Sequence, residues 1–294
     1  MSSRDLVLVL GICLVWGFNF VAGAKGMEAF TPMQFVALRF ACVLVLTLPF
    51  LRRPEPGQWR QLAGAGLFLG ALHFTFLQWA LKLSSDVTSI TILQNMSIPF
   101  AVLLAMLFLG ERAGWRTLAA TGVAFTGVLV IGLDPLVLSQ SKALVVVLCS
   151  ALFQALGSVL MRGLRGVSTF NFQCWSAVFS LPVLVGAMAL FDPQSLTTLG
   201  PVGPWHWAAL GYSIFMASLV GHGLFFILVQ RTPLPTLMPY LLTMPVFGTI
   251  FGILVWGDRP GWRLLAGGVM VLAGILVITL RGRRKALVPP AVGD

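Results

Sequence analysis

Long apolar runs dominate the chain and are separated by short clusters of charged residues, proline and glycine. A helix needs roughly 20 apolar residues to cross the hydrocarbon core of a bilayer. The pattern predicts ten such spans, numbered in chain order: 6–23, 33–51, 61–81, 87–108, 115–132, 142–161, 170–190, 205–229, 235–256 and 263–280. Strands of a transmembrane barrel would alternate apolar and polar residues instead. The predicted fold class is therefore an all-α integral membrane protein with ten transmembrane helices.

The chain also repeats itself. With a fixed offset of 147, residues 110–131 match residues 257–278 at 11 of 22 positions. Two copies of a five-span unit must cross the membrane in opposite directions, which is the usual construction of secondary transporters. The predicted parts are a first five-helix repeat, a second and inverted five-helix repeat, and a basic cytoplasmic tail, at 1–137, 138–281 and 282–294.

Composition excludes several classes of protein. Of the 294 residues, 58% are hydrophobic and 10% are charged, against about 45–50% and about 25% in ordinary globular proteins. A soluble fold of this composition would expose large apolar patches, so a soluble enzyme, a secreted disulfide scaffold and a disordered chain are excluded. The four cysteines lie inside apolar runs without a CxxC pair, which indicates core residues rather than disulfides or metal ligands.

The net charge of +10 would point to nucleic acid in a soluble protein. If both termini are cytoplasmic, 13 of the 19 basic residues fall in cytoplasmic segments, 5 fall on the opposite side, and Arg39 lies inside span two. Cytoplasmic loops of membrane proteins are enriched in lysine and arginine. The charge therefore predicts cytoplasmic termini, and a nucleic-acid partner is not needed to explain it.

Three short motifs resemble the EamA family of the drug/metabolite transporter superfamily, and within it the YddG-type amino-acid exporters: Trp16-Gly17-Phe18-Asn19-Phe20, Leu38-Arg39-Phe40 and Gly110-Glu111-Arg112. The resemblance covers essentially the whole chain. It implies ten helices in two inverted halves around a central cavity that is lined by spans one, three, four, six, eight and nine. We expect a multi-pass protein of the bacterial inner membrane that is a monomer or homodimer. Spans five and ten would act as scaffold. The second half departs from the pattern at Gln154-Ala155 and lacks a counterpart of Arg39, so we expect an asymmetric site.

Polar side chains in spans four and nine are the first candidates for that site. Thr91 and Asn95 share one helical face of span four, and Tyr240 and Thr243 lie in the matching part of span nine. Polar groups inside a membrane are costly and often functional, so we expect the two stripes to face each other and bind substrate. The alternative is hydrogen bonding between helices, which is common for threonine and asparagine in membranes.

Two prolines occupy the same spans. Pro99 and Pro245 lie in the interior of spans four and nine, and a proline frees a backbone carbonyl and can kink a helix. Paired interruptions in matching segments are typical of the moving or binding helices of a transporter. We expect a gating role for both prolines, against static packing as the alternative.

Spans one and six carry the next candidates. Trp16 lies near the middle of the membrane on one face with Asn19, and Gln154 and Ser158 are four residues apart on the aligned span six. An indole suits an apolar ligand, and an amide can bind both the ammonium and the carboxylate of a zwitterion. Core packing of the tryptophan and a helix-to-helix bond of the glutamine are the alternatives.

Other candidate contacts lie nearer the ends of the spans. Trp79 either caps the mouth of the cavity or anchors span three at the interface, and Trp175 is a shallower candidate on span seven. Gln78 lies one turn before Lys82 at the outer end of span three. Lys82 either attracts anionic groups or pairs with Asp86 four residues later.

Histidine and arginine provide the last candidates. His73 and His222 fall at nearly equivalent depths of spans three and eight. A lone buried histidine is usually a neutral core residue, but a matched pair favours substrate binding. Arg39 either contacts a substrate carboxylate, binds backbone carbonyls, or extends to the outer surface. No cluster has the spacing of a metal site, and we expect no metal and no cofactor.

The absence of other motifs narrows the function. No Asp or Glu lies in the middle of a span, and the chain has neither a Walker-type glycine loop nor an HExxH motif. We expect a non-enzymatic secondary transporter that exports small neutral metabolites, above all aromatic or other hydrophobic amino acids, by alternating access through a central cavity. Its partners are the small-molecule substrate and the lipid bilayer. The alternatives are an exporter of purines, drugs or other metabolites and a membrane-embedded lipid enzyme.

Overall fold

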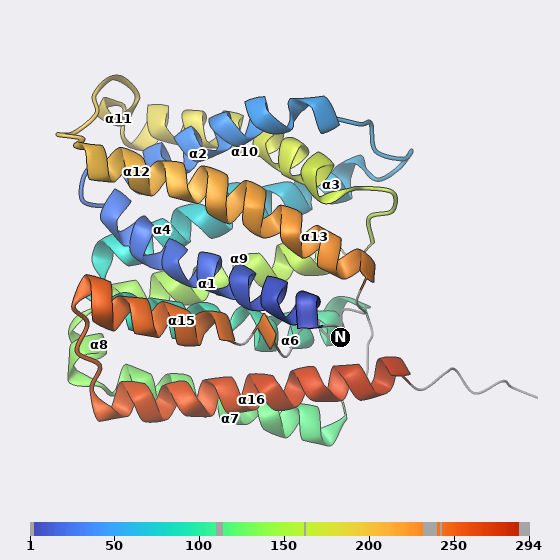
Figure 1. The fold of residues 1–294 in the computed structure, drawn as a ribbon, viewed down its shortest axis with the longest axis vertical. Coiled ribbons are helices and arrows are strands. Elements are labelled where there is room, and N and C mark those ends of the chain that lie inside the picture. The colour runs from blue at the N-terminus through green and yellow to red at the C-terminus, as the bar shows by residue number, and fades with distance from the viewer. Residues whose placement is uncertain (1–2, 110–113, 162, 232–239, 242, 288–294) are drawn as a thin grey trace, which may run out of the picture.

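The computed structural model describes residues 3–109, 114–161, 163–231, 240–241 and 243–287. All regular elements in these ranges are helices, which lie side by side in a bundle (Figure 1). Nine of the described helical segments are long and apolar enough to cross a membrane, and a shorter apolar helix covers Thr243–Trp256. The all-α membrane fold class is therefore confirmed.

The first half of the chain contains α1 (Ser3–Gly26), α2 (Pro32–Thr47), η1 (Leu48–Phe50), α3 (Trp59–Leu67), η2 (Phe68–Leu72), α4 (His73–Leu83), α5 (Val87–Gln94), α6 (Ser97–Leu109) and α7 (Trp115–Gly132). The second half contains α8 (Pro135–Ser139), α9 (Ser141–Met161), α10 (Thr169–Phe191), α11 (Gln194–Thr197), α12 (Pro204–Tyr212), η3 (Ser213–Gly221), α13 (His222–Arg231), α15 (Thr243–Phe251), η4 (Gly252–Trp256) and α16 (Trp262–Leu287). Several spans are thus built from two or three consecutive helical segments.

The predicted spans agree with these helices to within a few residues. The predicted start of span nine at 235–239, the 110–113 part of the repeat motif and the end of the tail at 288–294 lie outside the described residues. Helix α16 continues through Leu287, beyond the predicted start of the tail at 282. Helix α1 begins on the same side of the bundle as α16 ends (Figure 1), as an even number of spans requires.

Helices α7 and α16 lie side by side at one edge of the bundle (Figure 1). A Cβ atom added to Gly127 would lie 2.7 Å from the carbonyl oxygen of Gly267, and one added to Gly274 would lie 2.6 Å from that of Ala120. With the repeat offset of 147, these two contacts are equivalent, because Gly127 matches Gly274 and Ala120 matches Gly267. Small residues allow this close backbone approach in membranes.

Two matched spans are interrupted by π-helical segments. In span three η2 separates α3 from α4, and in span eight η3 separates α12 from α13. The segments end at Leu72 and Gly221, so each is followed directly by a histidine. Short π segments are rare in proteins, and those that occur are often found at functional sites. They leave backbone carbonyls that side chains of neighbouring helices can bind.

Two aspartates connect the repeats on the side of the bundle opposite the start of α1. Each lies in one repeat and caps a helix of the other repeat. The carboxylate of Asp258 accepts hydrogen bonds from the backbone N–H groups of Val87 and Thr88, at 2.9 and 2.7 Å, at the start of α5. Asp134 in turn accepts a 3.3 Å bond from the N–H of Leu264, in the first turn of α16. Carboxylates at helix N-termini satisfy free N–H groups and complement the helix dipole.

Asp86 lies beside this contact and is the N-cap of α5. Burial raises the pKa of Asp86 above its ordinary value, and the nearby Asp258 raises it further. Opposing these effects, its carboxylate accepts a 2.7 Å bond from the backbone N–H of Ser89. The N-terminus of α5 thus carries one local cap and one cap from the other repeat.

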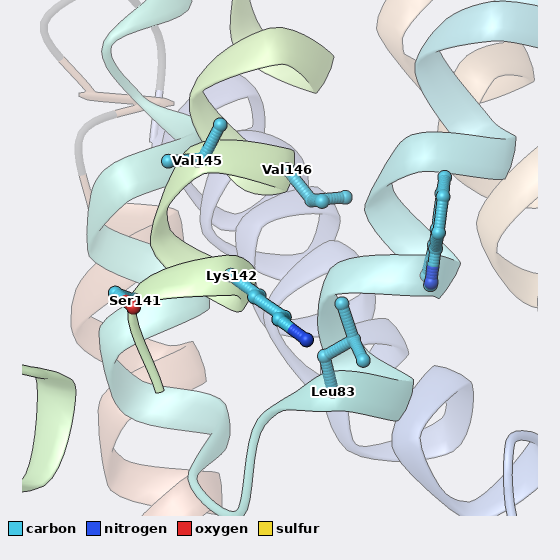
Figure 2. Close-up of a pocket in the computed structure, with 6 residues that line it drawn as sticks. Leu83, Ser141, Lys142, Val145 and Val146 are labelled. Carbon is cyan, nitrogen blue, oxygen red and sulfur yellow. The ribbon is translucent and has the colours of Figure 1, made fainter. Parts of the chain in front are cut away.

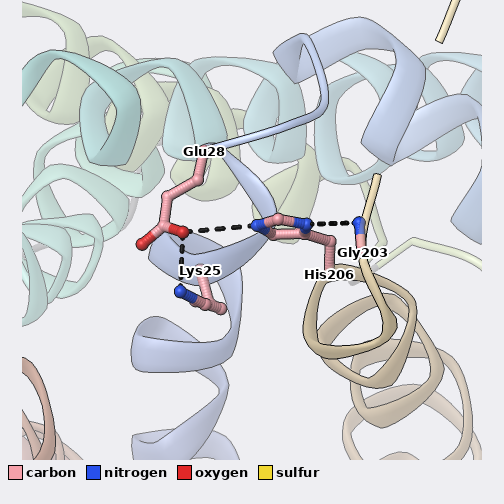
Figure 3. A network of polar contacts seen from close by, with 4 residues as sticks. All are labelled: Lys25, Glu28, Gly203 and His206. Carbon is pink, nitrogen blue, oxygen red and sulfur yellow. Dashed lines mark hydrogen bonds and ion pairs between the residues drawn. The ribbon is translucent and has the colours of Figure 1, made fainter. Parts of the chain in front are cut away.

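A surface network also joins the halves on this side (Figure 3). Glu28, just after α1, accepts bonds from Lys25 at 2.6 Å and from His206 of α12 at 3.3 Å. His206 Nδ1 accepts the Gly203 N–H, so its Nε2 carries the proton that points to Glu28. Partial burial would raise the pKa of Glu28, but the bonds from Lys25 and His206 hold this pKa below its ordinary value.

Candidate functional site

The π segment of span eight forms a joint between the two repeats. The carbonyl oxygen of Ala217 accepts a 3.0 Å bond from Trp16 Nε1 of α1 and a 2.9 Å bond from His222 Nδ1. The indole also lies against the imidazole, with ring centroids 5.1 Å apart, and against Phe225. A side chain at Gly221 would collide with the indole, so this glycine makes room for Trp16.

The π segment of span three is bound differently. His73 Nδ1 lies 2.9 Å from Ser150 Oγ of α9, and the same hydroxyl donates a 2.9 Å bond to the His73 carbonyl oxygen. Because a serine hydroxyl has one hydrogen, His73 Nδ1 is the donor to Ser150 Oγ. From α10, Ser180 accepts a bond from the Ala71 N–H and Ser176 donates to the Gly66 carbonyl. Serines of the second repeat therefore satisfy this interruption.

Arg39 of α2 lies between the π segments of spans three and eight. Its guanidinium donates a 3.0 Å bond from Nε to Ser218 Oγ in η3, and its Cζ lies 4.1 Å from the centre of the Phe74 ring in α4. The side chain does not extend to the surface, since Arg39 is only 3% exposed. Its Nη1 has no hydrogen-bond partner among the described residues. The charge interacts with both His73 and His222.

Span four is divided in the middle. Helix α5 ends at Gln94 and α6 begins at Ser97, with Asn95 and Met96 in a turn. Pro99 is the third residue of α6, and its ring excludes a regular helical bond to the carbonyl four residues earlier. The kink expected from Pro99 is therefore present as a break just before it. A gating role stays a proposal.

Spans four and nine meet through this region. A Cβ atom at Gly248 of α15 would press against the side chain of Thr91, so the two spans are in close contact. The polar groups, however, bond within their own helices: Thr91 to the Val87 carbonyl, Asn95 to the Thr91 carbonyl, and Thr243 to the Tyr240 carbonyl. The alternative of hydrogen bonds that cross between the two stripes is not seen among the described residues.

The start of span nine packs on α1. Tyr240 is half-buried against the cluster of Val9, Ile12, Cys13 and Leu228, and its carbonyl accepts a 3.5 Å bond from Cys13 Sγ. Pro245 is the third residue of α15 and is buried. It is thus placed like Pro99 in α6, while Leu242 lies outside the described residues.

Amides and hydroxyls in spans one and six are the remaining polar groups at the centre of the bundle. Gln154 Oε1 accepts a 3.0 Å bond from Gln94 Nε2 of span four, and Ser158 donates to the Gln154 carbonyl. Asn19 Oδ1 accepts a 2.8 Å bond from Ser213 of η3. Gln94 Oε1 is buried and has no hydrogen-bond partner among the described residues. These groups are neutral and offer both donors and acceptors.

Trp175 and Lys82 lie away from this centre. Trp175 donates a 2.8 Å bond to the carbonyl of Arg52 and packs edge-on against Trp59, so it holds the connection between α2 and α3. Lys82 donates to the Phe30 carbonyl at 3.5 Å; no ion pair between Lys82 and Asp86 is seen in the described ranges.

Trp79 and Gln78, neighbours on α4, lie on different faces of it. Trp79 is 43% exposed and borders an open groove at the end of α4 and the start of α9 (Figure 2). The groove is otherwise lined by Leu83, Ser141, Lys142, Val145 and Val146. Gln78 is buried against Gly23 of α1, and its Oε1 has no partner in the described part of the chain.

The centre includes residues that the sequence did not single out. They are Phe74, Gln94, Ser150, Ser213, Ala217 and Ser218. Ser218 lies one turn before His222, and a serine this close to a buried histidine was the available signal. Ala217 contributes only a backbone carbonyl, which no residue type reveals.

Comparisons with known proteins agree with this architecture. The model of the EamA-like transporter family matches residues 4–133 and again residues 141–280. A relative from Escherichia coli K12, a "Probable amino-acid metabolite efflux pump", is 27% identical and covers 98% of this chain and 99% of its own length. A "Probable terminal-alkyne amino-acid exporter" from Streptantibioticus cattleyicolor is 26% identical over 98% of each chain.

A solved crystal structure has the same fold. It is 20% identical, superposes with a TM-score of 0.64, and covers 97% of this chain and 100% of its own. The family model matches nearly the whole chain in two consecutive copies, and members of that family are transporters rather than enzymes. This chain, a multi-pass membrane protein, is therefore a member of the EamA-like transporter family.

Proposed function

We propose that this protein exports amino-acid-like metabolites, above all aromatic or other hydrophobic amino acids, across the bacterial inner membrane by alternating access. The observation that carries the proposal is the full-length similarity to two relatives whose names describe amino-acid efflux or export. Both align over 98% of this chain, so the similarity includes all the spans that carry the candidate site residues.

The chemistry of the centre supports this substrate class. The aromatic rings of Trp16 and Phe225 contact each other, and Asn19 and Gln154 supply neutral donors and acceptors in spans one and six. No Asp or Glu lies in the middle of any span, whereas an exporter of cations would need a buried carboxylate. A sugar phosphate would call for several lysines or arginines. An amino acid with an apolar side chain fits better than either.

The direction of transport depends on how the protein is oriented in the membrane. We propose that both termini are cytoplasmic, as the distribution of basic residues predicts. Reporter fusions after residue 294 and within the 192–204 connection should then report opposite sides of the membrane. Equal readings at the two points would contradict the orientation and the ten-span topology together.

Transport is tested by counterflow in proteoliposomes loaded with unlabelled phenylalanine, leucine or adenine. We expect exchange of labelled phenylalanine and leucine. We also expect a loss of roughly tenfold or more when Trp16, Gln154 or Tyr240 is replaced by Ala, because each change removes a contact near the centre. Trp205→Ala is the control, since that tryptophan is exposed at the start of α12. Exchange of adenine alone would replace the amino-acid proposal by a purine exporter.

A further inference from the structure

Arg39 is a buried cation with no counterion among the described residues. It lies in the middle of α2, and none of the carboxylates in the described ranges forms an ion pair with it. Its Nε donates a hydrogen bond to Ser218 Oγ, while its Nη1 has no acceptor in the part of the chain that the structure describes. Arginine stays charged in proteins and carries five N–H donors. The two N–H donors of Nη1 are therefore unused among the described residues.

The described residues around Arg39 do not compensate this charge. The face of Phe74 lies 4.1 Å from Cζ and offers a partial cation–π attraction. The Ser218 hydroxyl that accepts from Nε itself donates to the Ser213 carbonyl, so it is already engaged. The nearby titratable side chains are His73 and His222, which are neutral or positive. An unpaired buried charge is expensive, and the local potential is positive, so the site favours an anion.

The position is also central. Arg39 joins span two to the π segment of span eight through Ser218, and to the residue after His73 through Phe74. Gln173 of α10 donates to the Ser218 carbonyl at 3.4 Å, which adds a fixed polar group from span seven. The unused guanidinium donor therefore lies where the two repeats meet, and not at the lipid-facing surface.

We infer that Arg39 binds the carboxylate of the exported metabolite. This inference rests on the proposed function. The guanidinium binds a carboxylate through charge-assisted and often paired hydrogen bonds. Such a bond fixes the polar end of an amino acid beside His73 and His222, while its apolar side chain lies among the aromatic rings. Substrates should then be selected for a free carboxylate, whichever apolar side chain they carry.

Binding is measured first on the purified protein in detergent, by the rise in melting temperature with ligand concentration. The probes are phenylalanine, phenylacetate, which keeps the carboxylate alone, and phenylalaninamide, which keeps the ammonium alone. Phenylalanine and phenylacetate should bind roughly tenfold to hundredfold more tightly than phenylalaninamide. Equal stabilisation by phenylalanine and phenylalaninamide in the wild-type protein would overturn the inference without any variant.

Variants assign the effect to the residue. Arg39→Gln should lose the preference for carboxylates, and Arg39→Lys should keep part of it, because lysine retains the charge but not the fork geometry. Arg116→Gln is the matched control, because that arginine also lies over an aromatic ring, Trp115, but near the surface. A folded Arg39→Gln protein that keeps the preference, or loses all three ligands alike, would contradict carboxylate binding.

Counterflow separates this inference from the proposed function. If wild-type liposomes exchange phenylalanine and phenylalaninamide equally well, amino-acid export stands and the role of Arg39 is wrong. If they exchange no amino acid, the proposed function fails; a carboxylate preference that persists in the melting experiment and disappears in Arg39→Gln would then still support anion binding at Arg39.

Discussion

The contacts at the edge of the bundle follow the symmetry of the repeat, whereas the contacts at its centre do not. At the edge, α7 and α16 make two equivalent close contacts, at Gly127 and at Gly274. In the centre, the equivalent spans one and six make different contacts: Trp16 bonds to the Ala217 carbonyl, whereas Gln154 bonds to Gln94. A scaffold contact can be used twice in a repeat protein, whereas the proposed site for an asymmetric metabolite would need different contacts in the two halves.

The two histidines show the same divergence within matched positions. His73 and His222 each follow a π segment directly. His73 bonds to a serine of the other repeat, while His222 bonds to a carbonyl of its own span and shares it with Trp16. Equivalent backbone positions therefore carry different hydrogen-bond partners. The predictions below test how far the symmetry of the edge and the asymmetry of the centre extend.

The largest effect is expected at the edge. Gly127→Leu and Gly274→Leu each force a side chain into a backbone contact, and we expect each to lower the free energy of unfolding by about 1–3 kcal/mol. Thermal unfolding in detergent measures the loss. Gly122→Leu on the same helix α7 is the control, because a Cβ atom there meets nothing within 4 Å. If only one of the two interface glycines tolerates leucine, the edge is not symmetric.

A double-mutant cycle sharpens the comparison in the centre. Trp16→Phe and His222→Ala each leave the Ala217 carbonyl one of its two side-chain donors, and together they remove both. We expect a coupling free energy of about 0.5–3 kcal/mol in thermal unfolding. The equivalent cycle of Gln154→Leu with His73→Ala should be nearly additive, because Gln154 bonds to Gln94 instead. Equal coupling in the two cycles would show that the centre is more symmetric than these bonds indicate.

The smallest effect is expected at the surface network of Glu28. Its pKa is lower in the folded protein than its ordinary value of 4.5, so its contribution to stability is complete above pH 4.5 and disappears as the pH falls through the lowered pKa. Glu28→Gln should lower stability by less than about 1 kcal/mol at pH 7. The difference between wild type and variant should vanish in melting curves at acid pH. A difference that grows on acidification would rule out this pairing.

The sequence predicted the spans well because each is a continuous apolar run ended by charged residues or proline. The repeat was visible because residues 110–131 and 257–278 keep the same residues at many positions. The interruptions at η2 and η3 were not predicted, since apolar residues fill π and α segments alike. They depend on partners from other spans, such as Ser180 for the Ala71 N–H.

The candidate site was harder to predict than the fold. His73, His222 and Arg39 come together because residues of their spans that have no distinctive pattern, Phe74 and Ser218, contact the guanidinium. Trp175 has the residue type expected of a binding site, but its depth along span seven places it against Arg52 near the end of the bundle. Residue type alone does not give depth or facing direction, and both are set by packing.

The cap that Asp258 places on α5 has a consequence for synthesis. The N–H of Val87 leaves the ribosome 171 residues before the carboxylate that binds it. At typical elongation rates of about 5–20 residues per second, this interval is roughly 10 to 30 seconds. During that time α5 has its own N-cap, Asp86, which accepts the N–H of Ser89. The first half of the protein thus enters the membrane before the N-terminus of α5 has its second cap, and the connection that precedes the last span supplies this cap.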